Sequence, residues 1–142
     1  MNQRVILSLC GRQEYPGQEP DVIELVTEGD MVCRNGGWDI TYQESELTGL
    51  AGVETTFRVE PGLVVLTRTG KLHSQMVFQQ GVPHESLYQM EFGALMITVC
   101  AKQVLFDITP DGGFIDLVYE IEIENTAAGL VEYHLDIRTK EE

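Results

Sequence analysis

Most of the chain alternates apolar and polar residues with a period of two. In Phe114–Glu124, Ile115 and Leu117 fall on one phase of the alternation. Asp116 and Glu120 fall on the other phase. Because successive side chains of a β-strand point to opposite faces, this pattern predicts a strand with one apolar face and one polar face.

Turn residues divide the chain into short segments of this kind. Asn35-Gly36-Gly37 is a strong hairpin signal, and Pro61-Gly62 and Gly70-Lys71 mark further turns. Helical periodicity is almost absent, and Glu44–Leu50, with glycines nearby, allows at most one turn of helix. The predicted strands cover residues 3–10, 21–34, 38–45, 53–60, 63–69, 72–79, 86–90, 94–108, 114–124 and 130–138.

Strands joined by short turns form an up-and-down meander, which has two usual ways of burying one apolar face. We expect an all-β, closed antiparallel barrel of about eight to ten strands, and a two-sheet β-sandwich is the alternative. The short connections favour the barrel because a Greek-key sandwich needs long crossings. With no linker or repeat in the sequence, residues 1–142 are expected to form a single domain.

The amino-acid composition is strongly acidic. Nine Lys and Arg against 23 Asp and Glu give a net charge of −14, which makes nucleic acid and membrane surfaces poor partners and keeps a β-rich protein soluble. Cys10, Cys33 and Cys100 are odd in number and widely spaced, as is typical of a reducing compartment. The apolar run Val5–Leu9 is too short for a signal-peptide core, so we expect a cytoplasmic protein.

Short motifs are spread over the chain in a distinctive order. They are Tyr42-Gln43-Glu44-Ser45, Thr48-Gly49-Leu50, Glu54-Thr55-Thr56, Thr67-Arg68-Thr69-Gly70, Met76-Val77-Phe78, Tyr88 before Phe92-Gly93, and Gly112-Gly113 with Asp116-Leu117-Val118-Tyr119. Together they resemble the YwiB-like family of uncharacterised bacterial proteins. The resemblance implies a calycin-like (lipocalin-like) β-barrel in a bacterial cytoplasm, and it implies no established reaction, ligand or catalytic set.

Three polar residues fall on the apolar phase of their predicted strands. Glu44 follows the apolar series that ends in Tyr42, and Arg68 follows Val64 and Leu66 in Leu63–Thr69. Thr55 shares the phase of its strand's buried residues. An inward charge must be paired or wetted because a lone buried charge costs several kcal/mol, roughly. We therefore expect Glu44 and Arg68 to be partners.

These residues suggest a site for a small apolar or amphipathic ligand inside the barrel. Arg68 would hold the ligand's carboxylate, with tyrosine hydroxyls nearby. The alternative is structural: the ion pair plugs a barrel that its own side chains fill. The predicted ligand-binding residues are Glu44, Arg68, Tyr42, Thr55, Met76, Tyr88, Tyr119 and Trp38.

Sequence signals for catalysis, metals and cofactors are missing. There is no G-x-S-x-G, no phosphate loop that opens a helix and no H-E-x-x-H. His73 and His134 lie on polar phases and His84 in a loop, so we interpret all three as surface residues. We accordingly expect no metal, no cofactor and no catalytic residue that the sequence can name.

Three functional hypotheses remain. The first is a cytoplasmic barrel that binds a small ligand. The second is a filled barrel that acts through its outer surface as a homodimer or accessory protein, which Leu95–Val99, apolar on both phases, favours. The third is an enzyme of unknown type that uses Glu44, Arg68 and a tyrosine.

Overall fold

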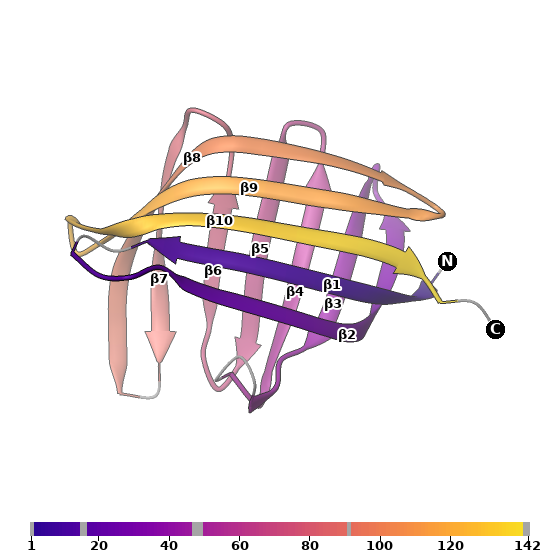
Figure 1. The fold of residues 1–142 in the computed structure, drawn as a ribbon, viewed down its shortest axis with the longest axis horizontal. Helices are drawn as coiled ribbons and strands as arrows, with labels where there is room; N and C mark the ends of the chain where they lie inside the picture. Colours follow the sequence, from indigo (N-terminus) through magenta and orange to yellow (C-terminus); the bar gives the residue numbers. More distant parts are fainter. Residues whose placement is uncertain (1, 15–16, 47–49, 91, 141–142) are drawn as a thin grey trace.

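The residues that the structure describes form ten β-strands (Figure 1). The computed structural model describes residues 2–14, 17–46, 50–90 and 92–140. No helix in these residues is long and apolar enough to cross a membrane. The strands are β1 (Asn2–Glu14), β2 (Asp21–Arg34), β3 (Gly37–Gln43), β4 (Val53–Glu60), β5 (Leu63–Gly70), β6 (Ser74–Phe78), β7 (Pro83–Met90), β8 (Gly93–Thr109), β9 (Gly112–Ile123) and β10 (Thr126–Thr139).

All ten strands belong to one antiparallel sheet in the order β6-β5-β4-β3-β2-β1-β10-β9-β8-β7. Apart from β6 and β7, strands that are consecutive in sequence are neighbours in the sheet. β1 also pairs with β10, so that the first and last strands meet in the middle of the sheet. The two sheet edges, β6 and β7, approach one another and nearly close the barrel. His73 and Gln89 exchange two backbone hydrogen bonds of 2.8 and 2.7 Å at one point of this seam.

The barrel has two differently shaped sides. The long strands β8, β9, β10, β1 and β2 run across one side, and the shorter strands β3 to β7 cross behind them (Figure 1). β2 contributes to both sides because it pairs with β1 over most of its length and with β3 from Gly29 onward. A Cβ atom at Gly29 would lie 2.5 Å from the carbonyl oxygen of Thr41. Glycine therefore permits the close backbone approach that this change of direction needs.

Register places the inward residues of β3 to β6 in three cross-strand rows. The first row is Trp38–Val59–Val64–Phe78 and the second is Ile40–Phe57–Leu66–Met76. The third is Tyr42–Thr55–Arg68–Ser74. We call the second the apolar row and the third the polar row. The first two rows belong to a core that continues through buried residues of β1, β9 and β10.

The predicted barrel is confirmed, and the sandwich alternative is set aside. Two connections differ from expectation. The β1–β2 hairpin extends to Gln13 opposite Asp21, although we expected the first strand to end at residue 10. β7 starts at Pro83, which we expected in a loop, because proline is tolerated as the first residue of a strand. The single helical turn allowed over Glu44–Leu50 falls partly on residues 47–49, outside the described residues.

Candidate ligand-binding cavity at one end of the barrel

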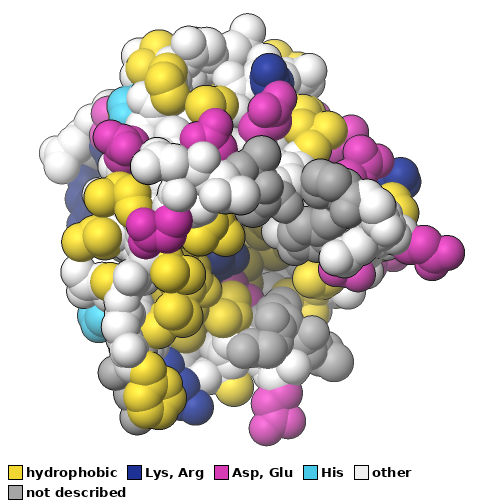
Figure 2. Space-filling model, turned by 90° about the vertical axis from the view of Figure 1, so that its left-hand side faces the viewer, with side chains coloured by type: hydrophobic (Ala, Val, Ile, Leu, Met, Phe, Trp, Pro, Cys, Tyr) yellow, Lys and Arg dark blue, Asp and Glu magenta, His cyan; other side chains and the backbone are white. Residues whose placement is uncertain are grey.

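A cavity of about 280 Å³ opens at the end of the barrel where β3 and β5 end, which we call the open end. Figure 2 shows a hollow on this side, with hydrophobic side chains around it and charged side chains in its depth. Its apolar wall includes Leu9, Met76, Ile97, Ile121 and Val131, drawn from both sides of the barrel. The barrel is therefore not filled by its own side chains at this end.

Glu44 lies at the bottom of the cavity because it continues the inward phase of β3 for one residue beyond the strand. Its backbone N–H donates to the carbonyl oxygen of Val53 at 2.8 Å, which holds the residue beside β4. Its side chain is only 1% exposed. The hydroxyl of Thr55 donates to Glu44 Oε2 at 2.5 Å. The buried carboxylate is thus anchored by a neighbour in the polar row, as a desolvated charge requires.

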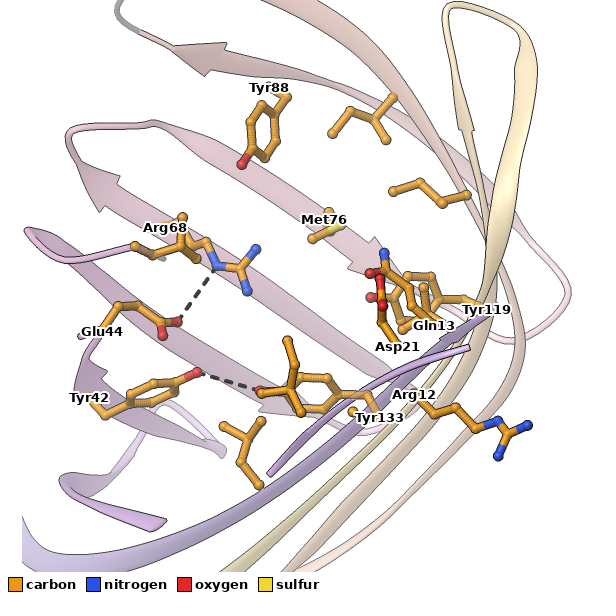
Figure 3. A pocket seen from close by; sticks show the side chains of 17 residues that line it. Arg12, Gln13, Asp21, Tyr42, Glu44, Arg68, Met76, Tyr88, Tyr119 and Tyr133 are labelled. Carbon is orange, nitrogen blue, oxygen red and sulfur yellow. Dashed lines mark hydrogen bonds and ion pairs between the residues drawn. The ribbon is translucent and has the colours of Figure 1, made fainter. Parts of the chain in front are cut away.

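Arg68 reaches into the same space from β5. Its Nε atom lies 3.9 Å from Glu44 Oε2, which is an ion pair but too long for a hydrogen bond. The Arg68 Nε is buried and has no hydrogen-bond partner. Figure 3 shows the guanidinium pointing into the cavity, with its Nε side toward Glu44. The pair predicted from the sequence therefore exists, but its geometry leaves donor capacity on the arginine.

Two tyrosines complete the polar end of the cavity. The hydroxyl oxygens of Tyr42 and Tyr133 are 3.5 Å apart. Burial raises the pKa of Tyr42 to about 12, and burial likewise raises the pKa of Tyr133 well above its usual range. Both hydroxyls therefore stay protonated at neutral pH, so they act as neutral hydrogen-bonding groups and not as bases.

Most of the predicted site residues meet at this cavity. Those that line it are Tyr42, Glu44, Arg68, Met76, Tyr88 and Tyr119. Thr55 lies behind Glu44 and orients it.

Trp38 is elsewhere, paired with Cys33 and Val59 near the opposite end. It shares the inward phase with Tyr42, but four residues of strand separate the two by about 13 Å. The expectation that Trp38 lines the same cavity is corrected accordingly.

Sequence reasoning missed Ser74 and Tyr133. Ser74 lies opposite Arg68 in the polar row, and its buried hydroxyl has no hydrogen-bond partner. Its signal was present, because Ser74 shares the phase of Met76 and Phe78. Tyr133 likewise shares an inward phase with Val131 on β10.

The histidines lie away from the cavity lining. His134, on the outer face, contacts Asp116 and Asp136 through its two ring nitrogens. The hydrogen bond with Asp116 is the main cause that raises the pKa of His134. His84 is hydrogen-bonded to Gln79 at 3.0 Å. Over the part of the chain that the structure describes, no group of three or more His, Cys, Asp or Glu side chains could hold a metal ion.

Comparison with known proteins supports a shared family and fold. The chain is 26% identical to the uncharacterised beta-barrel protein YwiB of Bacillus subtilis (strain 168) over 103 residues, 72% of this chain and 71% of that protein. The crystal structure of YwiB from Bacillus subtilis superposes with a TM-score of 0.88, covering 99% of this chain and 94% of that chain at 22% identity. Residues 7–137 match the model of the family described as Domain of unknown function (DUF1934). The chain therefore belongs to the DUF1934 family.

Proposed function

We propose that this protein is a binding barrel that holds a small amphipathic ligand in the cavity at its open end. The observation that carries the proposal is a cavity of about 280 Å³ whose wall is mainly apolar and into which Arg68 points (Figure 3). Ligand sites are typically concave and apolar, with a few polar groups that fix the ligand's orientation. The resemblance to lipocalin-like barrels fits this proposal and stays a prediction.

The alternative of a structural plug fits the geometry less well. A plug would be expected to satisfy its buried donors, because an unmade buried hydrogen bond costs about 1–3 kcal/mol. Here Arg68 Nε and Ser74 Oγ are both buried without partners. The cavity beside Arg68 is moreover open, and the guanidinium points into it, which a ligand explains better than a plug.

Native mass spectrometry of freshly purified protein, compared with its denatured mass, tests the proposal. We expect an additional non-covalent mass of up to a few hundred daltons, which denaturation removes, in line with a cavity of this size. A bare native mass from every preparation, together with no binding of small amphipathic probes, would contradict the proposal.

A homodimer is a second candidate, favoured by two exposed valines on the outer face of β2. Val22 and Val26 share this face and are 55% and 67% exposed. Sedimentation velocity would report a dimer that dissociates in a Val22→Ser/Val26→Ser variant. A monomer at high protein concentration would contradict this candidate.

We further propose a cytoplasmic location. All three cysteines are free, and Cys10 and Cys33 are exposed. Free exposed thiols suit a reducing compartment. Fractionation of cells that express a tagged chain would test the location.

A further inference from the structure

We propose that the ligand carries an oxyanion, a carboxylate or a phosphate, at its buried end, and that Arg68 binds this group. The rest of the ligand is a short apolar chain. This inference rests on the binding function proposed above and narrows it to one chemical class.

The Arg68 guanidinium, which points into the cavity, favours an acceptor-rich group in the ligand (Figure 3). In the described residues, the buried side-chain atoms without a hydrogen-bond partner are Arg68 Nε and Ser74 Oγ. Register makes these two residues direct cross-strand neighbours in the polar row. A guanidinium has only donors, and a serine hydroxyl has one to give. Because Nε faces Glu44, a group bound in the cavity meets the outer nitrogens of the guanidinium, and that group must supply acceptors.

Glu44 does not fill that role. Its Oε2 atom already accepts the Thr55 hydroxyl at 2.5 Å and stays 3.9 Å from Arg68 Nε. Its charge nevertheless attracts the guanidinium and favours the observed direction of the side chain. We therefore assign Glu44 as a positioning residue, whose contact with Arg68 leaves the arginine's hydrogen bonds to another partner.

The cavity lining also holds the carboxylates of Asp21 and Glu44, but Asp21 is exposed and Glu44 already accepts the Thr55 hydroxyl. The preference for an anion therefore rests on Arg68. Both Arg12 and Arg68 belong to the cavity lining, but Arg12 points away while Arg68 points inward (Figure 3). Tyr42 adds a phenol that stays neutral because of its raised pKa. An ammonium group at this depth would meet the guanidinium. A carboxylate or phosphate, in contrast, matches the planar fork of the guanidinium in a bidentate way.

The volume limits the apolar part. A cavity of 280 Å³ equals about nine water volumes of ~30 Å³ each, so a ligand on the order of ten heavy atoms fits. Leu9, Ile97 and Val131 provide apolar wall for it. A medium-chain amphiphile with one oxyanionic end meets both requirements.

Four probes of equal chain length test the inference by isothermal titration calorimetry. They are octanoate, octyl phosphate, octanol and octylamine, each added to ligand-free protein. We expect octanoate or octyl phosphate to bind at least tenfold more tightly than octanol, and octylamine to bind most weakly. The order of the two anions tells whether carboxylates or phosphates are the natural class.

The outcomes separate the two proposals. Octanol or octylamine binding as tightly as both anions would overturn the oxyanion inference and leave the binding function standing. If none of the four probes binds and the native mass is bare, the binding function fails as well.

Variants assign the effect to Arg68. Arg68→Gln is expected to weaken binding of the preferred anion at least tenfold and to leave octanol binding unchanged. Arg138→Gln, which alters an exposed arginine on β10, is the matched control and should change neither value. Unchanged anion binding by folded Arg68→Gln would overturn the assignment. If that variant does not fold, Arg68→Lys keeps the positive charge and should retain the preference for anions at lower affinity. Loss of this preference in Arg68→Lys, with normal binding by Arg138→Gln, would overturn the assignment.

Discussion

The apolar row and the polar row of the barrel lie side by side, two residues apart on the same four strands, and they do opposite things. The apolar row packs into the core and reaches the cavity only at Met76. In the polar row, Tyr42 and Arg68 both line the cavity. Both rows arise from the same alternation and the same hairpins. The comparison shows that strand geometry decides which side chains face inward, and their chemistry decides whether the interior is a core or a cavity.

The two rows also differ in what they contribute to folding. Burying an apolar side chain stabilises by about 1.5–3 kcal/mol, so the apolar row favours folding at each position. The polar row has two unsatisfied atoms, and its Arg68 forms an ion pair of 3.9 Å with Glu44, an arrangement that a purely structural role would not favour. Departures of this kind from the rules of stability tend to mark functional sites.

The largest expected effect on stability comes from removing a large side chain of the apolar row. Phe57 is fully buried, and Phe57→Ala is expected to lower the free energy of unfolding by about 3–5 kcal/mol because it leaves a cavity. Urea denaturation measures the change. Gln75→Ala, an exposed position on β6, is the control and should stay within about 0.5 kcal/mol of the parent. A loss below about 1 kcal/mol for Phe57→Ala would show that this row does not dominate the core.

The ion pair of the polar row gives the next largest effect. Arg68→Met leaves the Glu44 carboxylate buried without a cation. Because the pair is long and Arg68 is partly exposed, we expect a loss of about 1–3 kcal/mol, the cost of an unsatisfied buried group. Adding Glu44→Gln removes the unpaired charge and should recover part of the loss. A double-mutant cycle by urea denaturation measures the coupling, and strict additivity of the two changes would contradict an interacting pair.

A smaller change of opposite sign is expected at Ser74. Ser74→Ala removes a buried hydroxyl without a partner and should raise the free energy of unfolding of ligand-free protein by about 1 kcal/mol. Thr55→Val is the counterpart, expected to destabilise because the Thr55 hydroxyl donates to Glu44. If Ser74→Ala destabilised the protein instead, its hydroxyl would have to be bonded in solution.

The smallest expected effect on stability comes from His134 on the outer face of the barrel, away from the apolar and polar rows. Asp116 raises the pKa of His134 above 6.5, so the charged histidine stabilises the fold fully below pH 6.5. This contribution is lost as the pH rises through the raised pKa. It is small because the half-exposed pair is screened by water. Urea denaturation at several pH values should show the decline, and His134→Asn should abolish it while His84→Asn should not.

The strands and their inner faces were predictable because a period of two is visible in the sequence. The inward placement of Arg68 and Glu44 followed from phase alone and is observed. The polar row as a unit was not predictable, because it depends on register. Ser74 joins Arg68 only once the turn after Gly70 sets the β5–β6 pairing.

The sequence also did not predict how far along its strand a residue lies from the cavity, or how large the barrel interior is. Trp38 has the right phase for the site but the wrong position, and phase carries no information on depth. Whether the barrel is filled depends on its cross-section and on both of its sides together. Tyr133 is an example. It lies on β10, and its ring packs against Phe57 of β4, with ring centres 5.6 Å apart, although the two strands are not neighbours in the sheet.

The pairing of β1 with β10 places the first and last strands side by side, while the edges of the sheet lie at β6 and β7. Lys140 donates a backbone hydrogen bond to Arg4, so the start of β1 and the end of β10 lie side by side (Figure 1). If β10 were joined to β1 by a short linker and the chain were cut at the β6–β7 turn, the strands would follow the sheet from one edge to the other. The seam between β6 and β7 is therefore the natural place for new termini in a circular permutant, where a cut interrupts the fewest ladders of the sheet.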